Sequence, residues 1–189
     1  FPTDSYTHSV GSLRFLEDGT LMASHGDGAS ASFADVLALR SQSLDSYAGK
    51  LLRIKPDGSA PQAPLTENPF NDGSNSIRSK VWAYGLRNPF RFGVHPTTGL
   101  PWIGDVGWNT WEEINKGVPG ANYGWPCWEG NGQQPGYQAS FPTQCQPVTA
   151  AVVTNPSYTY DRTVGSAAIG GAIFTGAQYP AAYVGNFFF

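Results

Sequence analysis

The first part of the chain alternates apolar and polar residues over short segments, which is the pattern of half-buried β-strands. Residues 12–15 and 20–24 fit the two arms of a hairpin, because the Asp-Gly pair between them favours a tight turn. Residues 31–40 instead carry apolar side chains at helical spacing, which predicts one short helix. A further strand is expected at residues 49–54, where a Pro-Asp-Gly turn follows.

The same order of elements recurs after a polar connection rich in Pro and Asn. Strands are expected at residues 81–86, 90–94, 100–103 and 112–115, with a turn at residues 95–99. A weaker third copy begins at residues 167–174, turns at residues 176–180 and runs into the Phe triplet that ends the sequence. The chain therefore repeats one strand-turn-strand unit, with insertions of different length between the copies.

Repeats of a few short antiparallel strands with variable insertions are typical of β-propeller blades. We therefore expect an all-β fold with about three blades, and a β-sandwich is the alternative. Three blades cannot close a ring, because propellers have four or more, and open sheet edges would remain. Residues 1–189 are interpreted as part of a single propeller domain that is incomplete at both ends, since the sequence starts without Met and stops at three aromatic residues.

Composition agrees with a strand-rich, turn-rich protein. The chain has 23 Gly, 15 Pro and 14% aromatic residues, whereas only 13% of its residues are charged. A net charge of −3 without a basic cluster argues against a nucleic-acid partner. No apolar run approaches the roughly 18 residues that cross a membrane as a helix, so no membrane span is expected in this segment.

Cys127 and Cys145 flank a stretch rich in Gly, Gln and Pro. No His lies between them and their spacing does not fit a metal site, so a disulfide is the favoured interpretation, with two reduced buried thiols as the alternative. A disulfide would place the protein in an oxidising compartment, either secreted or periplasmic.

Seven short motifs occur in an order and spacing that resemble a known family. They are His8-Ser9-Val10-Gly11, Gly26-Asp27-Gly28, Gly49-Lys50-Leu51-Leu52-Arg53-Ile54, Gly85-Leu86-Arg87-Asn88-Pro89, Asp105-Val106-Gly107, Glu112-Glu113-Ile114-Asn115 and Asn122-Tyr123-Gly124-Trp125-Pro126. The chain resembles the soluble pyrroloquinoline-quinone (PQQ) glucose/sorbosone dehydrogenases, a family that includes aldose sugar dehydrogenases and Hedgehog-interacting proteins. This resemblance implies a six-bladed propeller with PQQ over one face, of which this chain would be the middle.

The resemblance implies roles for residues in the first motifs. His8 matches the family's catalytic base, and a neutral imidazole suits the removal of a sugar hydroxyl proton near pH 7. A His that makes only a structural hydrogen bond is the alternative. Arg87 and Asn88 match the pair that contacts the quinone, where a planar guanidinium suits an oxygen that gains charge; a loop ion pair and a turn are the alternative. Asp27 and Tyr160 are also expected at the cofactor, and Tyr160 would line the substrate cleft.

Two calcium sites are implied in the same way. The carbonyls of Gly107 and Trp108 match those that hold calcium beneath the quinone, and calcium accepts backbone oxygens. Glu113 and the carbonyl of Tyr123 match a second, structural calcium site. Glu112 and Glu113 would face opposite ways on a strand, which leaves Glu112 solvated in the simplest interpretation. The Trp125 and Trp128 rings are expected to pack rather than to hold sugar.

Two neighbours of the expected site depart from the soluble glucose dehydrogenases, which have Asp where this chain has Thr7 and Gln where it has Gly28. The function favoured by the resemblance is PQQ- and calcium-dependent oxidation of an aldose to a lactone, with electrons passed to an external acceptor. The substitutions keep a second hypothesis open, namely a non-catalytic extracellular propeller that binds carbohydrate or protein. The remaining blades, with further cationic residues for the quinone, are expected from sequence outside this chain.

Overall fold

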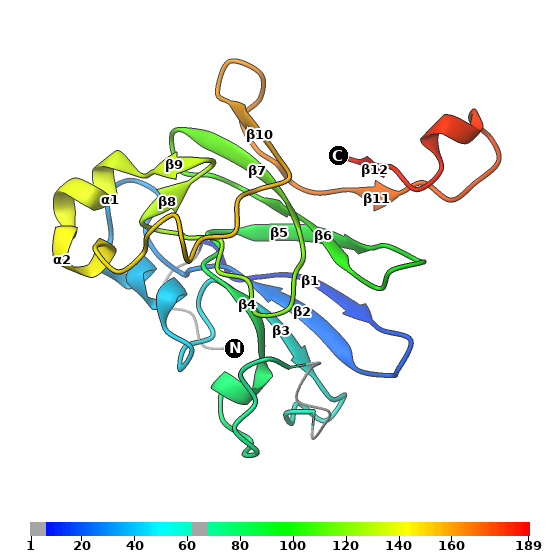
Figure 1. The fold of residues 1–189 in the computed structure, drawn as a ribbon, viewed down its shortest axis with the longest axis horizontal. Helices are drawn as coiled ribbons and strands as arrows, with labels where there is room; N and C mark the ends of the chain where they lie inside the picture. Colours follow the sequence, from blue (N-terminus) through cyan, green and yellow to red (C-terminus); the bar gives the residue numbers. More distant parts are fainter. Residues whose placement is uncertain (1–6, 62–67) are drawn as a thin grey trace.

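A computed structural model describes residues 7–61 and 68–189 (Figure 1). Its first sheet contains four antiparallel strands in sequence order: β1 (Val10–Phe15), β2 (Leu21–His25), β3 (Lys50–Ile54) and β4 (Val81–Tyr84). The β1–β2 hairpin turns at the expected Asp-Gly pair, where Gly19 has a φ of 81° that favours glycine. The strands predicted in this part of the sequence are confirmed.

The second sheet has the order β10-β7-β6-β5. It contains β5 (Pro89–Val94), β6 (Pro101–Asp105), β7 (Trp111–Lys116) and β10 (Tyr158–Asp161). The first three were predicted. The fourth, β10, was not predicted, because it joins β7 only after a long connection, with Tyr160 opposite Glu112.

The rest of the β-structure is smaller. The expected third copy forms only the hairpin of β11 (Ala172–Ile173) and β12 (Phe187–Phe188), with a 3-10 turn, η3 (Ala181–Tyr183), between the two strands. Another short hairpin, β8 (Trp128–Glu129) with β9 (Gly132–Gln133), lies in the connection between β7 and β10. Two four-stranded sheets and the start of a third form an open, partial propeller, and the predicted fold class is confirmed.

The helical segments correct one prediction and add two short helices. The helix expected at residues 31–40 is instead a 3-10 helix, η1 (Val36–Gln42). It begins at Val36 because the Asp35 carboxylate accepts a hydrogen bond from the Leu37 N–H and caps its start. Phe33 and Val36 are 61% and 58% exposed, so the apolar spacing does not mark a buried face. A second 3-10 turn, η2 (Arg78–Lys80), precedes β4, and α1 (Pro135–Ser140) and α2 (Pro142–Cys145) follow β9.

The packing of the two sheets brings one set of loops together. A core of apolar side chains joins the sheets: Met22, Leu51, Trp82, Ala83, Leu86, Phe92, Ile103, Ala121 and Tyr123. The chain passes directly from the end of β4 to the start of β5. The first residue of β5, Pro89, lies opposite Asp105 at the end of β6. The connections that follow β2, β4, β6 and β10 therefore lie at the same end of the two sheets.

In the described parts of the chain, no helix is long and apolar enough to cross a membrane.

Candidate active site

His8 lies just before β1, at the loop end of the first sheet. Its Nδ1 is 2.7 Å from Oδ1 of Asp27, and its side chain is 8% exposed. His8 has a φ of 52°, which is uncommon for a residue with a Cβ, and the Gly28 N–H donates to its carbonyl at 3.2 Å. A Cβ at Gly26 would overlap the His8 backbone, so glycine is required there for His8 to approach Asp27. The structure thus brings the predicted base and Asp27 together.

The Asp27 carboxylate is buried and surrounded by hydrogen-bond donors. Besides His8, Oδ1 accepts from the Ala29 N–H at 3.0 Å, and Oδ2 accepts from Trp125 Nε1 at 2.7 Å. A carboxylate can only accept, so the shared proton lies on Nδ1 of His8 and Nε2 of the neutral ring is left as the basic atom. Asp27 thus orients His8, and Trp125 packs in the core as predicted and also holds Asp27.

Arg87 continues this set of contacts towards the second sheet. Its guanidinium lies over the Trp125 ring, with Cζ 5.5 Å from the centroid. Nη1 donates to the carbonyls of Val106 and Gly107 at 2.8 and 2.7 Å. Burial lowers the pKa of Arg87, and the nearby Asp27 carboxylate opposes that shift. Within residues 7–61 and 68–189, Nε and Nη2 of Arg87 have no hydrogen-bond partner, so two donors remain for a ligand.

Asp105, at the end of β6, fixes the loop that carries Arg87 and Asn88. Its two oxygens accept from the backbone N–H groups of Arg87 at 3.0 Å and of Asn88 at 2.6 Å. Burial raises the pKa of the Asp105 carboxyl, although the two N–H donors and the Arg87 charge act in the opposite direction. Asp105 belonged to a motif of the sequence but had no assigned role, and its position at the end of a buried strand was the available signal.

A cavity of about 530 Å³ opens beside His8. Its lining includes Asn88 and Arg91 from the second sheet and residues 9–11 from the start of the first. Its volume lies within the range of small-molecule sites, and His8, Asn88 and Arg91 are polar groups that could orient a ligand. The structure therefore brings His8 and Asn88 to one cavity, with Asp27 and Arg87 behind them.

The predicted calcium carbonyls of Gly107 and Trp108 converge on one atom. Nη2 of Arg162, a residue that sequence reasoning missed, donates to Gly107 O at 2.9 Å and to Trp108 O at 2.7 Å. Two oxygens that hold one cationic nitrogen suit a hard cation such as calcium, although they supply only part of the six to eight ligands that calcium takes. A Cβ at Gly107 would overlap the Trp111 carbonyl, so this loop needs glycine.

Glu112 is buried, and the expectation that it is solvated was wrong. Oε1 forms an ion pair with Nη1 of Arg162 at 2.7 Å, and Oε2 accepts from the N–H groups of Gly107 at 3.0 Å and Ala168 at 2.8 Å. Burial raises its pKa, and its hydrogen bonds and Arg162 counteract this. The alternating strand pattern misled the sequence interpretation, because Arg162, which follows β10, and the backbone of Gly107 and Ala168 contact the Glu112 side chain that was expected to face water.

Glu113 points towards different partners from Glu112, as two neighbours on a strand should. Its carboxylate accepts from Gly130 N at 2.6 Å and from Asn115 Nδ2 at 3.0 Å, and burial raises its pKa. The Tyr123 hydroxyl donates to the Lys116 carbonyl at 2.8 Å, and burial raises its pKa. No three His, Cys, Asp or Glu side chains among the described residues could hold a metal together. The structural calcium site thus stays a prediction.

Tyr160 lies on β10, apart from the His8 cavity lining. Burial raises its pKa, and the Glu112 carboxylate adds to the shift. Its ring stacks with that of Phe189, at 6.3 Å between centroids. The structure thus places Tyr160 near the Glu112–Arg162 pair, and its role at a cofactor or substrate stays a prediction.

The predicted disulfide is present between Cys127 and Cys145, with an S–S distance of 2.01 Å. It joins the β8 region to the end of α2 and belongs to a buried cluster with Trp125, Tyr137 and Val148. Tyr137 also packs edge-on against Trp125, at 5.0 Å between centroids. The disulfide therefore supports the wall of side chains behind Asp27.

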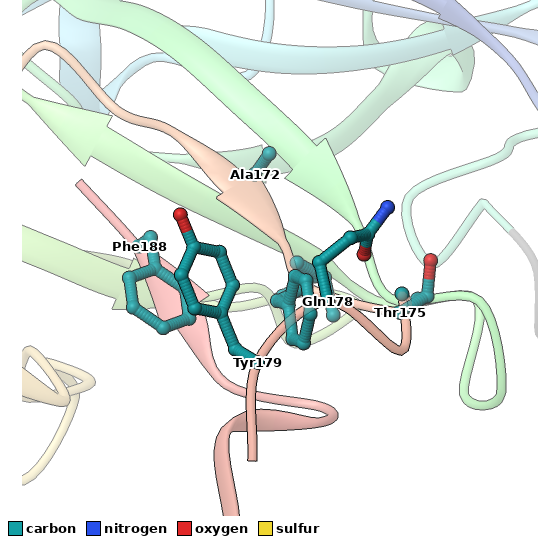
Figure 2. A pocket seen from close by; sticks show the side chains of 8 residues that line it. Ala172, Thr175, Gln178, Tyr179 and Phe188 are labelled. Carbon is teal, nitrogen blue, oxygen red and sulfur yellow. The ribbon is translucent and has the colours of Figure 1, made fainter. Parts of the chain in front are cut away.

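A second cavity, of about 430 Å³, lies on the β11–β12 hairpin (Figure 2). Figure 2 shows the rings of Tyr179 and Phe188 on one side and the polar ends of Thr175 and Gln178 on the other. None of the predicted site residues lines it. The site residues expected from the sequence therefore lie away from this cavity, and His8 and Asn88 line the other one.

The open sheets and the loop cluster at one end define this chain as part of a β-propeller protein. The family described as glucose / sorbosone dehydrogenase matches residues 2–189. The chain belongs to that family.

Two relatives are similar to this chain over part of their length. The chain is 38% identical over 85 residues to the aldose sugar dehydrogenase YliI of Escherichia coli, which covers 45% of this chain and 22% of that protein. It is 35% identical over 99 residues to quinoprotein glucose dehydrogenase B of Acinetobacter calcoaceticus, with 52% and 19% covered. The chain thus spans about a fifth of the length of these two relatives.

A solved structure agrees with the fold. The PQQ-bound form of an aldose sugar dehydrogenase from Streptomyces coelicolor superposes with a TM-score of 0.61 at 26% identity, covering 92% of this chain and 40% of that one.

Proposed function

We propose that this chain is part of a PQQ- and calcium-dependent dehydrogenase that oxidises an aldose at its anomeric carbon to a lactone. The observation that carries the proposal is the His8–Asp27 pair, with its 2.7 Å contact, at the edge of a cavity that Asn88 also lines. Family membership and the names of the relatives point to sugar oxidation. The quinone is supported by the PQQ-bound structural neighbour, and calcium by the converging carbonyls of Gly107 and Trp108.

His8 acts as the base in this proposal. Asp27 holds the Nδ1 proton, so Nε2 of the neutral ring takes the proton of the anomeric hydroxyl. The negative Asp27 carboxylate then stabilises the imidazolium that forms, at a contact largely shielded from water. PQQ, when bound, supplies the acceptor for the hydride that leaves the anomeric carbon.

The remaining residues of the site bind and orient. Arg87 offers its unused Nε and Nη2 donors towards an oxygen that gains negative charge, and the Trp125 ring and Asp105 restrict its position. Asn88 adds a polar side chain at the cavity. The carbonyls of Gly107 and Trp108 would hold calcium, which supplies positive charge next to the quinone.

The test uses the full-length protein loaded with PQQ and calcium. Sugar-dependent reduction of an artificial dye, as the external electron acceptor, is expected for the wild type and is expected to fall by about 10²–10⁴-fold in His8→Gln, because general-base catalysis contributes that much. His95→Gln is the matched control, since His95 lies in the β5–β6 turn at the other end of the sheets. A protein that binds PQQ fully but oxidises no sugar would contradict the proposal and support the non-catalytic propeller.

We further propose that the protein works outside the cytoplasm, in the periplasm or after secretion. The Cys127–Cys145 disulfide supports this, because such bonds persist in oxidising compartments. Protein isolated from its native compartment under acid quench should carry no alkylatable thiol at these two positions. Quantitative alkylation of both would contradict the proposed location.

A further inference from the structure

The Arg162 guanidinium occupies the place that a metal ion would take at the Gly107 and Trp108 carbonyls. Arg162 follows β10 and is 32% exposed at its side chain. Nη2 meets both carbonyls, at 2.9 and 2.7 Å, while Nη1 meets Glu112 and the Ser166 carbonyl. Four oxygens from four residues therefore surround one side chain.

This arrangement has the chemistry of a cation site. A calcium ion bound to both carbonyls would lie about 2.3–2.6 Å from each oxygen, close to where Nη2 now lies. The ion and the guanidinium would repel each other strongly, because two positive charges would share the same two oxygens. One of the two must therefore leave.

Glu112 decides how costly the exchange is. It has no exposed surface, and Arg162 is the cation that its Oε1 contacts. A buried carboxylate that loses its partner is strongly unfavourable, so Arg162 can leave only if another cation approaches Glu112. A divalent ion at the two carbonyls would supply that charge.

We propose that Arg162 is a built-in competitor for calcium: it occupies the carbonyl pair of Gly107 and Trp108, and a divalent ion binds there only by displacing it. When no metal is present, Arg162 thereby donates hydrogen bonds to the loop carbonyls and neutralises the charge of Glu112. It also sets the calcium affinity of the site below the value that the oxygens alone would give. This inference rests on the proposed function for the identity of the metal, whereas the contacts of Arg162 are independent of it.

The experiment measures calcium binding by isothermal titration calorimetry in full-length protein freed of metal and quinone. Arg162→Gln removes the charge that contacts both carbonyls, whereas Arg87, whose Nη1 donates to the Gly107 carbonyl at 2.7 Å, stays the same in every variant. Arg162→Gln is expected to bind calcium at least tenfold more tightly than the wild type. Arg78→Gln is the matched control, because it makes the same charge change at an exposed arginine that pairs with the exposed Asp45. Its calcium affinity should equal that of the wild type.

A second variant covers the case in which Arg162→Gln exposes Glu112 to an uncompensated charge and fails to fold. The double variant Glu112→Gln with Arg162→Gln removes both charges and should also bind calcium more tightly than the wild type. Equal or weaker binding in the variants that fold, or no calcium binding in any of them, overturns the proposal. Because the readout is binding, tighter binding together with absent sugar oxidation would refute the proposed function and leave this inference standing.

Discussion

Asp27→Asn is the sharpest perturbation of the candidate site, because it changes one atom at the centre of three hydrogen bonds. The carboxylate accepts from His8, Ala29 and Trp125. An amide has one accepting oxygen and one donating nitrogen, so it cannot accept from both sides. If the amide oxygen keeps the hydrogen bonds from His8 and Ala29, the amide nitrogen faces the Trp125 N–H, and the two donors cannot bond to each other. If the amide flips, His8 must accept at Nδ1 and carry its proton on Nε2.

The expected magnitudes follow from these contacts. Each orientation of the amide leaves one buried N–H group without an acceptor and removes a charge, so the free energy of unfolding should fall by about 1.5–3 kcal/mol. Neither orientation supplies a negative charge to the protonated His8 ring, and the flipped one also removes the free lone pair on Nε2. Sugar oxidation should therefore fall by at least about 100-fold.

Three measurements test this reasoning on the full-length protein. Urea unfolding gives the stability, dye reduction gives the rate, and ¹⁵N chemical shifts of the His8 ring report which nitrogen carries the proton. Asp45→Asn is the control, since Asp45 is 71% exposed at its side chain. A stability change below about 0.5 kcal/mol, which is the range of ordinary surface substitutions, together with an unchanged rate would refute the proposed role of Asp27.

Further predictions concern the disulfide, the glycine loop and pH. Replacing Cys127 and Cys145 with Ala should lower the free energy of unfolding by about 3 kcal/mol, because the disulfide closes a loop of 18 residues; equal denaturation midpoints with and without reductant in the wild type would contradict this. Gly107→Ala should cost about 1–3 kcal/mol, because its Cβ overlaps the Trp111 carbonyl, and should also weaken calcium binding in calorimetry. Burial lowers the pKa of His25, so the folded protein binds fewer protons there than the unfolded protein does. The free energy of unfolding should therefore rise with pH up to about 6.5, by at most about 1.4 kcal/mol per pH unit. In His25→Asn the free energy of unfolding should depend less on pH between pH 5 and 8, and an unchanged dependence would exclude His25 as the cause.

The local alternation of residues was sufficient to predict most strands of the two sheets. It failed where an element depends on contacts distant in sequence. β10 has only four residues and is identified by its pairing with β7, which no local pattern records. The helix at residues 31–40 was wrong in extent because the Asp35 carboxylate, and not the apolar spacing, determines where η1 begins.

The sequence predicted those residues of the site that stand in recognisable motifs, but it did not predict how they contact one another. His8, Asp27 and Arg87 are connected in the structure through the Trp125 side chain, which the sequence identified only as a packing residue. Arg162 could not be identified from the sequence, because its role depends on hydrogen bonds to backbone carbonyls in the loop that follows β6. Its contact with the buried Glu112 is evident only after β10 has been placed.

The late position of β10 in the sequence has a consequence for the order in which the protein assembles. β7 cannot pair with β10 until the chain has completed the long connection that contains β8, β9, α1 and α2 (Figure 1). The Cys127–Cys145 disulfide shortens this connection and lowers the entropy lost when β10 returns to the sheet. During synthesis, the His8 side of the site can therefore form early, whereas the carbonyl pair gains its Arg162 partner only when the second sheet is finished.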